Sequence, residues 1–335
     1  MQSTINSLVY LRTKTQVDCD SLDFRVVENY GPFVDCTSNQ AECYFQFIAP
    51  ERTDLIRQSI AYAREIHHEF PGVEFKAFAV ELCMVTVNLT AIPHISGCIH
   101  IMANPTLSNS VQKTVENAKR IIELCQRWNP NIDPSRICIK IPATWEGLQA
   151  CRELKSAGIK TLATTLFTIE QAMLAAEVGC VSISPFIHEL KVHFDTTYKD
   201  KDPIFGLCVE AQRYFQKYSY QTSVKACSLI SIDEVMMVAG VASVTIPADL
   251  LQALQVGEGS EENFKQLSLF SGSSEDGIDN IEKITFGNNR SKFDRAFSQN
   301  DNGKGKIKTT QAVELFCEYQ FKSEALMGSL TEAGY

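Results

Sequence analysis

Apolar residues recur every three or four positions in several parts of the chain, which is the spacing of one face of a helix. Residues 53–70 and 111–125 both show this pattern. Two further helices are predicted over 144–158 and 168–179. Each of these begins with a threonine, whose hydroxyl can accept a hydrogen bond from the first turn, and ends near a glycine that can terminate a helix.

Short apolar runs bounded by turn residues lie between these helices and predict strands. The runs 137–142, 161–167 and 180–186 alternate with the helices just described. This order is typical of a parallel sheet, because parallel neighbours need a crossover connection. Five more candidates bring the total to eight: 16–20, 33–36, 98–103, 223–228 and 243–247. Eight strands with helices between them over roughly 250 residues favour a (β/α)8 barrel over an open sheet.

We therefore expect residues 1–335 to form a single α/β domain, a (β/α)8 TIM barrel with a C-terminal helical extension. The barrel core would occupy about 14–255. Residues 257–277 are polar and acidic, which predicts a solvated loop. A helical segment over about 285–335 would follow, with its final helix around 310–325 packed back on the barrel.

The composition narrows the classes of partner. Basic residues number 31 against 40 acidic ones, a net charge of −9, with no basic block, so we expect neither nucleic acid nor an anionic membrane as a partner. The most apolar stretch, 77–103, is interrupted by charged and polar residues and a proline, which argues against a membrane span. The N-terminus resembles no secretory signal, and the twelve cysteines are scattered without a CxxC pair. We expect reduced thiols, a cytoplasmic location and no metal site.

A lysine stands inside the predicted strand ICIKIP. Strand alternation puts Cys138 and Lys140 on one face, and Lys140 lies near the carboxyl end of its strand, where TIM barrels keep their catalytic groups. Burial of an amine favours its neutral form, which can attack a ketone or aldehyde to form a Schiff base. Spacing alone leaves another interpretation open, in which the lysine extends from an edge strand into solvent.

The sequence IKIPATWEG, followed by LKSAGIKTLATTLFTIEQA and SISPF, closely resembles the transaldolase family of class I aldolases, which includes the fructose-6-phosphate aldolases. VDCTSNQA resembles the D-x-T-[TS]-N-P motif of that family, and YFQKYSYQTSVKACS resembles the segment that enters its seventh strand. The resemblance extends over nearly the whole chain. It implies that Lys140 is the Schiff-base lysine and that no cofactor is needed. Dimers are common in the family, so the resemblance is compatible with a homodimer.

The resemblance assigns roles to further residues. Asp20 matches the aspartate that moves the proton of the substrate hydroxyl during cleavage of the carbon–carbon bond, a role that a carboxylate at short range can fill. Asn39 matches an asparagine that hydrogen-bonds a substrate hydroxyl, and Thr164 matches a threonine that helps to hold the catalytic water. Further substrate-binding residues are expected at Ser184, Phe186 and Ser228.

The family pattern is broken at the position of its water-activating glutamate. Met102 stands there, and a thioether cannot take a proton. His100, two positions earlier on the same strand face, is our candidate for taking over part of this acid/base work. The alternative is that His100 is a buried, hydrogen-bonded histidine with no role in the reaction.

The expected phosphate-binding residues are also replaced. Two arginines that hold the sugar phosphate in the family fall on Glu189 and Ile230, and an expected asparagine is Leu162. Each charge-assisted contact is worth roughly 1.5–3 kcal/mol, so losing two would weaken phosphate binding by a factor of hundreds or more. Lys191 or Lys225 could compensate, but alternation counted from Ser228 turns Lys225 away from the barrel interior.

These departures indicate a substrate different from a sugar phosphate. We expect an enzyme that forms an imine on Lys140 and makes or breaks a carbon–carbon bond in an unphosphorylated, more apolar carbonyl substrate, as in the biosynthesis of secondary metabolites. Leu162, Met102 and Ile230 would supply the apolar surface of its pocket. Two alternatives remain: a true transaldolase that transfers a dihydroxyacetone unit between sugar phosphates, and a non-catalytic barrel protein.

Overall fold

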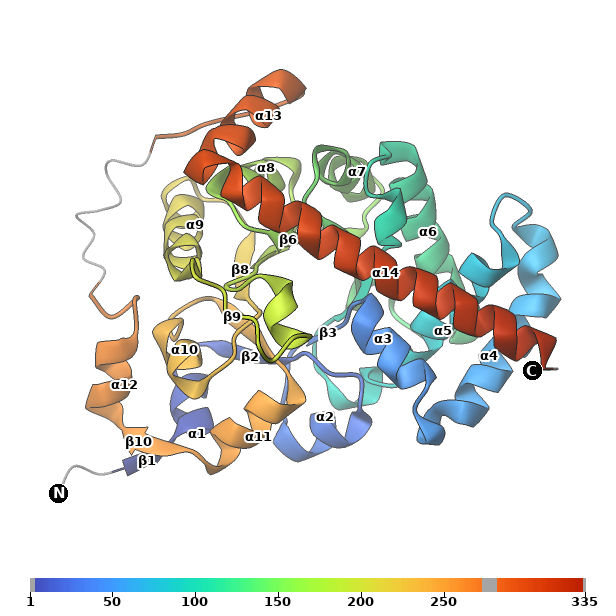
Figure 1. The fold of residues 1–335 in the computed structure, drawn as a ribbon, viewed down its shortest axis with the longest axis horizontal. Coiled ribbons are helices and arrows are strands. Elements are labelled where there is room, and N and C mark those ends of the chain that lie inside the picture. Colours follow the sequence, from blue (N-terminus) through green and yellow to red (C-terminus); the bar gives the residue numbers. More distant parts are fainter. Residues whose placement is uncertain (1–3, 273–281, 334–335) are drawn as a thin grey trace.

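A closed barrel of eight parallel strands forms the centre of the molecule (Figure 1). The computed structural model describes residues 4–272 and 282–333. The barrel strands are β2 (Gln16–Cys19), β3 (Cys36–Thr37), β4 (Ile99–Met102), β5 (Ile137–Pro142), β6 (Lys160–Leu166), β7 (Ser182–Pro185), β8 (Ser223–Ala226) and β9 (Ser243–Ile246). They follow one another around the barrel in sequence order, and β9 pairs with β2 to close it. The predicted TIM barrel is confirmed.

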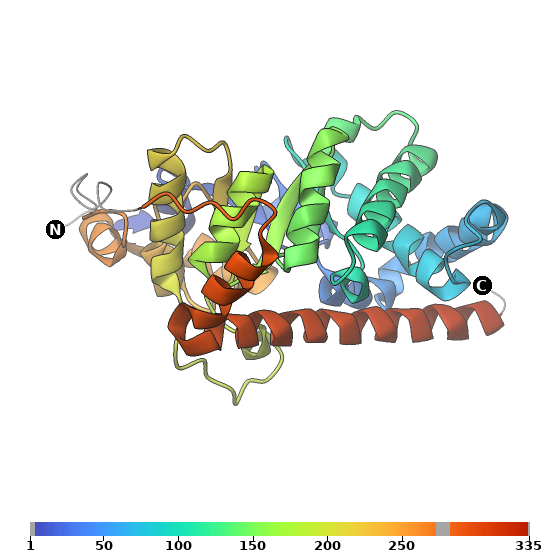
Figure 2. The same ribbon diagram turned by 90° about the horizontal axis from the view of Figure 1, so that it is seen from above.

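Helices surround this barrel and connect its strands (Figures 1 and 2). They are α1 (Ser7–Arg12), α2 (Phe24–Tyr30), α3 (Gln40–Phe47), α4 (Thr53–Ile66), α5 (Phe75–Leu89), α6 (Val111–Trp128), α7 (Trp145–Ser156), α8 (Ile169–Val178), α9 (Phe205–Lys217), α10 (Ile232–Met237), α11 (Ala248–Val256), α12 (Glu261–Leu267), α13 (Arg290–Gln299) and α14 (Lys304–Glu332). Short 3₁₀ helices include η1 (Pro50–Arg52), η4 (Pro105–Leu107) and η6 (Leu190–His193).

The capping residues that the sequence indicated are present. The Thr144 hydroxyl accepts a hydrogen bond from the Gly147 N–H at 2.9 Å, at the start of α7. Thr168 and Gln171 form a capping box at the start of α8. Gly179 follows α8 with a φ of 86°, a left-handed conformation that glycine adopts without strain. Local sequence therefore determines where these helices begin and end.

The two faces of the strands differ in polarity. Apolar side chains that point outward, such as Ile99, Ile137 and Ile139, are fully buried against the surrounding helices. Each such side chain contributes about 1.5–3 kcal/mol by its burial. The inward face carries polar and charged side chains, among them Asp18, Thr37, His100, Lys140, Thr164, Ser182, Lys225 and Thr245. The helices thus stabilise the barrel from outside, while its interior is available for polar chemistry.

Two predicted segments differ in the structure. β3 begins at Cys36 instead of residue 33, since the Cys98 N–H bonds to the Asp35 carboxylate at 2.7 Å and not to a backbone carbonyl. The predicted loop 257–277 contains β10 (Glu258–Ser260), which pairs with β1 (Thr4–Asn6), and also α12. Phe264 of α12 is buried and its ring lies 5.1 Å from that of Tyr10, which holds the helix on the barrel. Residues 273–277 lie outside the described residues.

α5 is the most apolar helix of the part of the chain that the structure describes. By length and composition alone, Phe75–His94 could cross a membrane, and 72% of its most apolar window is buried inside the protein. α5 packs against α4, α6 and α14. Its buried Glu81 accepts hydrogen bonds from Arg120 at 2.6 Å and from Asn117 at 2.7 Å. A core helix of a globular protein has these same features, so the membrane interpretation has only weak support.

The long C-terminal helix α14 crosses the barrel at the end where the strands finish (Figures 1 and 2). It packs against α3, α5, η4 and η6, which all belong to segments that follow barrel strands. As expected from the sequence, the final helix packs back on the barrel, although it is longer than the predicted 310–325. α14 therefore covers part of the face where a TIM barrel keeps its active site.

Candidate active site

A cavity of about 210 Å³ lies at the carboxyl ends of the barrel strands. Its polar wall consists of Asp20, Asn39, Glu42, Lys140, His193 and Ser228. Its apolar wall consists of Ala41, Phe45, Phe186, Leu190, Phe194, Cys227, Pro247 and Phe316. Phe316 comes from α14, so the C-terminal helix completes the cavity.

Lys140 lies in this cavity with its side chain 3% exposed. β5 is a central strand paired with β4 and β6, which excludes the edge-strand interpretation. The amine donates a hydrogen bond to the Ser38 carbonyl at 3.3 Å. Within residues 4–272 and 282–333, no carboxylate forms an ion pair with it. The amine is thus buried in the barrel interior with a single carbonyl partner.

Asp20 follows β2 and points into the same cavity. The Thr37 hydroxyl donates to its Oδ1 at 2.6 Å, and Thr37 in turn contacts the Thr245 hydroxyl at 2.6 Å. This pair of threonines fixes the orientation of the carboxylate. Asn39 also lines the cavity, and its Oδ1 accepts a hydrogen bond from the Glu42 N–H at 3.0 Å, which caps α3. The structure therefore brings Lys140, Asp20 and Asn39 together.

The remaining expected pocket residues occupy different positions relative to the cavity. Phe186 lies in its wall, with its ring 6.5 Å from that of Phe316. Ser228 also lines it, and its hydroxyl contacts His193 Nε2 at 2.9 Å. Thr164 and Ser184 are fully buried, and their hydroxyls have no hydrogen-bond partner in the described part of the protein. Neither of them lines the cavity.

The three apolar residues expected to contact the substrate also lie outside the cavity wall. Met102 is fully buried in an apolar cluster that includes Phe186 and Phe316, so it packs behind the wall. Leu162 is also fully buried, opposite Lys140 in the strand register. Ile230 lies outside the cavity with its side chain 51% exposed. Ser228 has a φ of 60°, and this left-handed residue turns the chain away before Ile230.

His100 is not brought into the Lys140 cavity. It lies one interior layer nearer the amino ends of the strands, opposite Cys138, whereas Met102 lies opposite Lys140. Its Nε2 contacts Asp35 Oδ2 at 3.1 Å, and burial lowers the pKa of its ring. This environment is the one expected from the alternative interpretation, in which His100 is a buried, hydrogen-bonded histidine.

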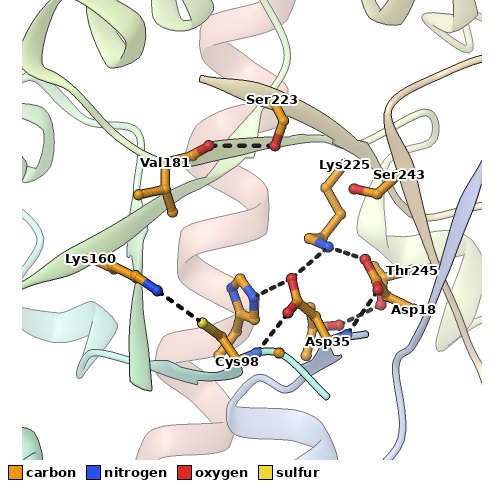
Figure 3. A network of polar contacts seen from close by, with 12 residues as sticks. Asp18, Asp35, Cys98, Lys160, Val181, Ser223, Lys225, Ser243 and Thr245 are labelled. Atoms are coloured by element: carbon orange, nitrogen blue, oxygen red, sulfur yellow. Dashed lines mark hydrogen bonds and ion pairs between the residues drawn. The ribbon is translucent and has the colours of Figure 1, made fainter. Parts of the chain in front are cut away.

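A charged network occupies the layer of the barrel interior that lies nearer the amino ends of the strands (Figure 3). Lys225 contacts the carboxylates of Asp18 and Asp35, the latter at 3.2 Å. His100 and Lys225 line a second cavity of about 320 Å³, at the opposite end of the barrel from Lys140. Burial acts to lower the pKa of Lys225, but the two carboxylates outweigh it and raise that pKa above its ordinary value. Lys225 is thus held as a charged partner of two acids.

The inward position of Lys225 corrects the expectation from the sequence. Alternation counted back from Ser228 turned Lys225 outward, but Ser228 itself is left-handed and interrupts the extended backbone. Counted within β8, Lys225 faces inward, between the outward-facing Val224 and Ala226 of the helix-packed core. Its ammonium group pairs with Asp18 and Asp35 and lines the cavity at the opposite end of the barrel from Lys140. Lys225 therefore cannot take the place of a phosphate-binding arginine.

The two positions where the family would hold phosphate are not cationic. Glu189 accepts a hydrogen bond from the Tyr198 hydroxyl. Lys308 lies 3.8 Å from Glu189, but it also pairs with Asp200 at 3.1 Å. Among the residues that line the cavity, only Lys140 and His193 are basic. The cavity therefore presents no cluster of positive charge to a phosphate.

The sequence alone did not indicate Glu42 as a residue of the site. It lines the cavity, and burial together with the charge of Asp20 raises its pKa to about 7, although a hydrogen bond from the Leu22 N–H opposes the rise. The spacing of Asn39 and Glu42 is that of a capping box, which by itself predicts only a helix start. The described residues contain no group of three or more histidines, cysteines or carboxylates arranged to hold a metal ion.

Comparison with known proteins finds related sequences over most of the chain. The sequence model of the transaldolase/fructose-6-phosphate aldolase family matches residues 17–330. The chain is 31% identical over 255 residues to transaldolase B of Pasteurella multocida, which covers 74% of this chain and 79% of that protein. It is 31% identical over 263 residues to a transaldolase of Alteromonas mediterranea, covering 77% and 81%. A transaldolase of Buchnera aphidicola is 30% identical over 259 residues, covering 75% and 80%.

Proposed function

The chain belongs to the transaldolase/fructose-6-phosphate aldolase family, and we propose that it forms a Schiff base between Lys140 and a carbonyl substrate in order to make or break a carbon–carbon bond. The observation that carries this proposal is the buried Lys140 amine, which shares one cavity with the Asp20 carboxylate and has no ion-pair partner in the described chain. A lysine amine in such a position can attack the carbonyl carbon of a substrate bound in the cavity.

The first stage uses Lys140 alone as nucleophile. Its neutral nitrogen attacks the carbonyl carbon, the carbon–oxygen π electrons move to oxygen, and a proton passes from nitrogen to that oxygen to give a carbinolamine. The carbinolamine hydroxyl then takes a proton from an acid and leaves as water, and the nitrogen lone pair forms the protonated imine. The Asn39 amide group, at the start of α3, can donate a hydrogen bond to a hydroxyl of the bound substrate.

The second stage uses Asp20 as base. Its carboxylate accepts the proton of the hydroxyl next to the bond that breaks, a new carbonyl forms, and the electrons of the carbon–carbon bond move into the protonated imine to give an enamine. In the reverse direction the enamine attacks an aldehyde, and Asp20 returns the proton. The hydrogen bond from Thr37, at 2.6 Å, keeps the carboxylate in place for both directions.

The walls of the cavity support an unphosphorylated and rather apolar substrate. Four phenylalanines and a leucine line it, and the two expected arginines are Glu189 and Ile230. Losing two contacts of roughly 1.5–3 kcal/mol each would weaken phosphate binding by a factor of about 10² to 10⁴. The cavity volume of about 210 Å³ also suits a small molecule. We infer that such a substrate belongs to specialised metabolism.

A second candidate function is transfer of a dihydroxyacetone unit between sugar phosphates. The names of the relatives favour it, since the three proteins compared above are transaldolases. The absence of arginine from the cavity wall argues against it. Measured transfer from fructose 6-phosphate to erythrose 4-phosphate would establish this function.

Borohydride trapping tests the proposed function. The protein is incubated with fructose 6-phosphate, dihydroxyacetone or a set of unphosphorylated ketones and aldehydes, then reduced, and the modified peptide is identified by mass spectrometry. We expect an adduct on Lys140 with unphosphorylated compounds. The adduct should disappear in Lys140→Met and persist in Lys113→Met, which changes an exposed lysine of α6. Absence of any Lys140 adduct would overturn the proposal and favour a non-catalytic barrel.

A further inference from the structure

Imine chemistry requires an acid/base group in addition to the Lys140 nucleophile and to Asp20, whose carboxylate carries the proton of carbon–carbon cleavage. The carbinolamine hydroxyl must be protonated before it leaves as water, and the attacking water must lose a proton when the imine is hydrolysed. Met102 occupies the position where the family resemblance expects a glutamate for this work. His100 faces the other end of the barrel. The cavity wall offers the carboxyl group of Glu42 and the imidazole of His193, and the Nε2 atom of His193 is engaged by the Ser228 hydroxyl at 2.9 Å.

Glu42 approaches this cavity from the first turn of α3. The Lys140 amine contacts the Ser38 carbonyl, and Asn39, the next residue, caps α3. Glu42 stands three residues beyond the cap and lines the same cavity as Lys140 and Asp20. The amine thus lies at the start of the helix whose first turn carries this carboxyl group.

The carboxyl group of Glu42 is held at one oxygen. Its Oε1 accepts hydrogen bonds from the Leu22 N–H at 2.9 Å and from the Ser21 hydroxyl at 3.4 Å. Its Oε2 forms no hydrogen bond with any described residue, so this oxygen is left for the contents of the cavity. Ser21 and Leu22 directly follow Asp20, whose carboxylate lines the same cavity and whose charge acts on the Glu42 carboxyl group. A group fixed at one oxygen and free at the other suits proton transfer.

The charges around Glu42 favour exchange of a proton near neutral pH. Burial and the charge of Asp20 raise its pKa to about 7, and a group with a pKa near the working pH is present in both protonation states. The titratable groups that face it are Asp20, Asp23, Cys36, Cys43, Arg52 and Lys140. Two carboxyl groups in one site commonly divide the roles of acid and base.

We propose that Glu42 is the catalytic acid/base residue that forms and hydrolyses the Lys140 imine, an inference that rests on the proposed function. Protonated Glu42 donates its proton to the carbinolamine hydroxyl, the carbon–oxygen bond breaks, water leaves, and the nitrogen lone pair forms the imine double bond. Glu42 is then a carboxylate. In hydrolysis it accepts a proton from the attacking water as the new carbon–oxygen bond forms. The resulting carbinolamine passes its hydroxyl proton to the nitrogen, the carbon–nitrogen bond breaks, and the Lys140 amine and the carbonyl compound are released. Asp20 keeps the separate proton of carbon–carbon cleavage.

The experiment follows exchange of the carbonyl oxygen of dihydroxyacetone with ¹⁸O-labelled water, which requires imine formation and hydrolysis but no carbon–carbon cleavage. Glu42→Gln keeps an oxygen that can accept a hydrogen bond from the Leu22 N–H, but its amide cannot act as an acid or a base near neutral pH. We expect exchange above the buffer background to fall about 10² to 10⁴-fold, and the limb near pH 7 in the pH–rate profile to disappear. Glu51→Gln, which changes an exposed glutamate paired with Arg25, is the matched control and should behave as wild type.

The outcomes separate this inference from the proposed function. If wild type and Glu42→Gln exchange at the same rate with the same pH profile, while borohydride still traps Lys140, then the role of Glu42 is wrong and the proposed function stands. If wild type shows neither exchange nor a Lys140 adduct with any member of the panel, both fail. Should Glu42→Gln not fold, as judged by circular dichroism, Glu42→Asp is used. It should retain a slower exchange with a pH limb, and a profile without that limb would also overturn the inference.

Discussion

Replacing Lys225 by methionine tests the stability that we assign to the charged network at the amino end of the barrel. Lys225 is 2% exposed and contacts Asp18, which is fully buried, and Asp35. Methionine keeps the length of the side chain and removes the ammonium group. Two carboxylates would then remain close together without a cation between them, which is the costly way to break a buried ion pair.

The magnitude follows from the hydrogen bonds that remain. Removal of one partner of a buried pair costs roughly 3–5 kcal/mol. Asp18 would still accept hydrogen bonds from Gln16 Nε2 at 3.0 Å and from the Asp35 N–H at 2.9 Å. These contacts keep part of its charge solvated, so we expect the free energy of unfolding to fall by about 3 kcal/mol, at the lower end of that range.

The loss should also depend on pH. Burial acts to raise the pKa of Asp35, but its hydrogen bond from His100 and the charge of Lys225 outweigh this and hold that pKa well below its usual range. A carboxylate with a lowered pKa stabilises the fold above its unfolded pKa of about 3.9, and this stabilisation is lost as the pH falls below it. The difference between wild type and Lys225→Met should therefore be largest at neutral pH and shrink below about pH 4.

Urea unfolding followed by circular dichroism measures both effects, with Lys113→Met as the matched control on the exposed side of α6. The double variant Asp18→Asn/Lys225→Met should recover part of the loss, because it removes a negative charge that has no partner. A free energy of unfolding within about 1 kcal/mol of wild type at pH 7 would refute the reasoning. So would a loss that stayed constant down to pH 3.

Three further predictions concern the cavity and the fold around it. The pKa of Glu42 is raised to about 7, so its contribution to the free energy of unfolding is full below its unfolded pKa and is lost as the pH rises through 7. Between pH 4.5 and 8, urea titrations should therefore show wild type losing up to about 3 kcal/mol more unfolding free energy than Glu42→Gln. Parallel pH curves for the two proteins would contradict this. Asp20→Asn keeps an oxygen that can accept a hydrogen bond from Thr37, but this oxygen cannot take a proton, so retro-aldol turnover should fall about 10² to 10⁴-fold. Borohydride should still trap dihydroxyacetone on Lys140. Loss of this adduct as well would show that Asp20 acts before the carbon–carbon bond is cleaved. Phe264→Ala should cost about 3 kcal/mol by removing a buried ring from α12, and unchanged urea unfolding would mean that α12 is not held by that contact.

Much of the fold could be predicted from the sequence because its signals are local. The apolar runs of β5, β6 and β7 show where strands are covered on their outer face by helices, and threonine and glycine mark the ends of α7 and α8. Lys140 was recognisable for the same reason, since it is a single charged residue within such a run. The motif around it identified the family, whose model matches residues 17–330.

The predictions that failed depend on backbone geometry that no residue pattern displays. One left-handed residue, Ser228, breaks the alternation in the segment after β8, so Lys225 faces inward and Ile230 faces out. A TIM barrel interior also has two ends, and period-two alternation does not say which layer a residue joins. That is why His100 was assigned to the Lys140 cavity when it pairs with Asp35 at the other end.

Glu42 shows what only the tertiary structure decided. In the sequence it is a polar residue at the start of a helix, 98 positions before Lys140. In the closed barrel, β3 and β5 lie on either side of β4, which brings the segment after β3 towards Lys140. The loop after β2 supplies the hydrogen bonds from Ser21 and Leu22 to Glu42. The sequence determined most of the strands, the ends of α7 and α8 and the lysine within β5, because local periodicity and side-chain chemistry are sufficient for these. The protonation and position of Glu42 arise from burial and from the charge of Asp20, which exist only once distant segments are packed together.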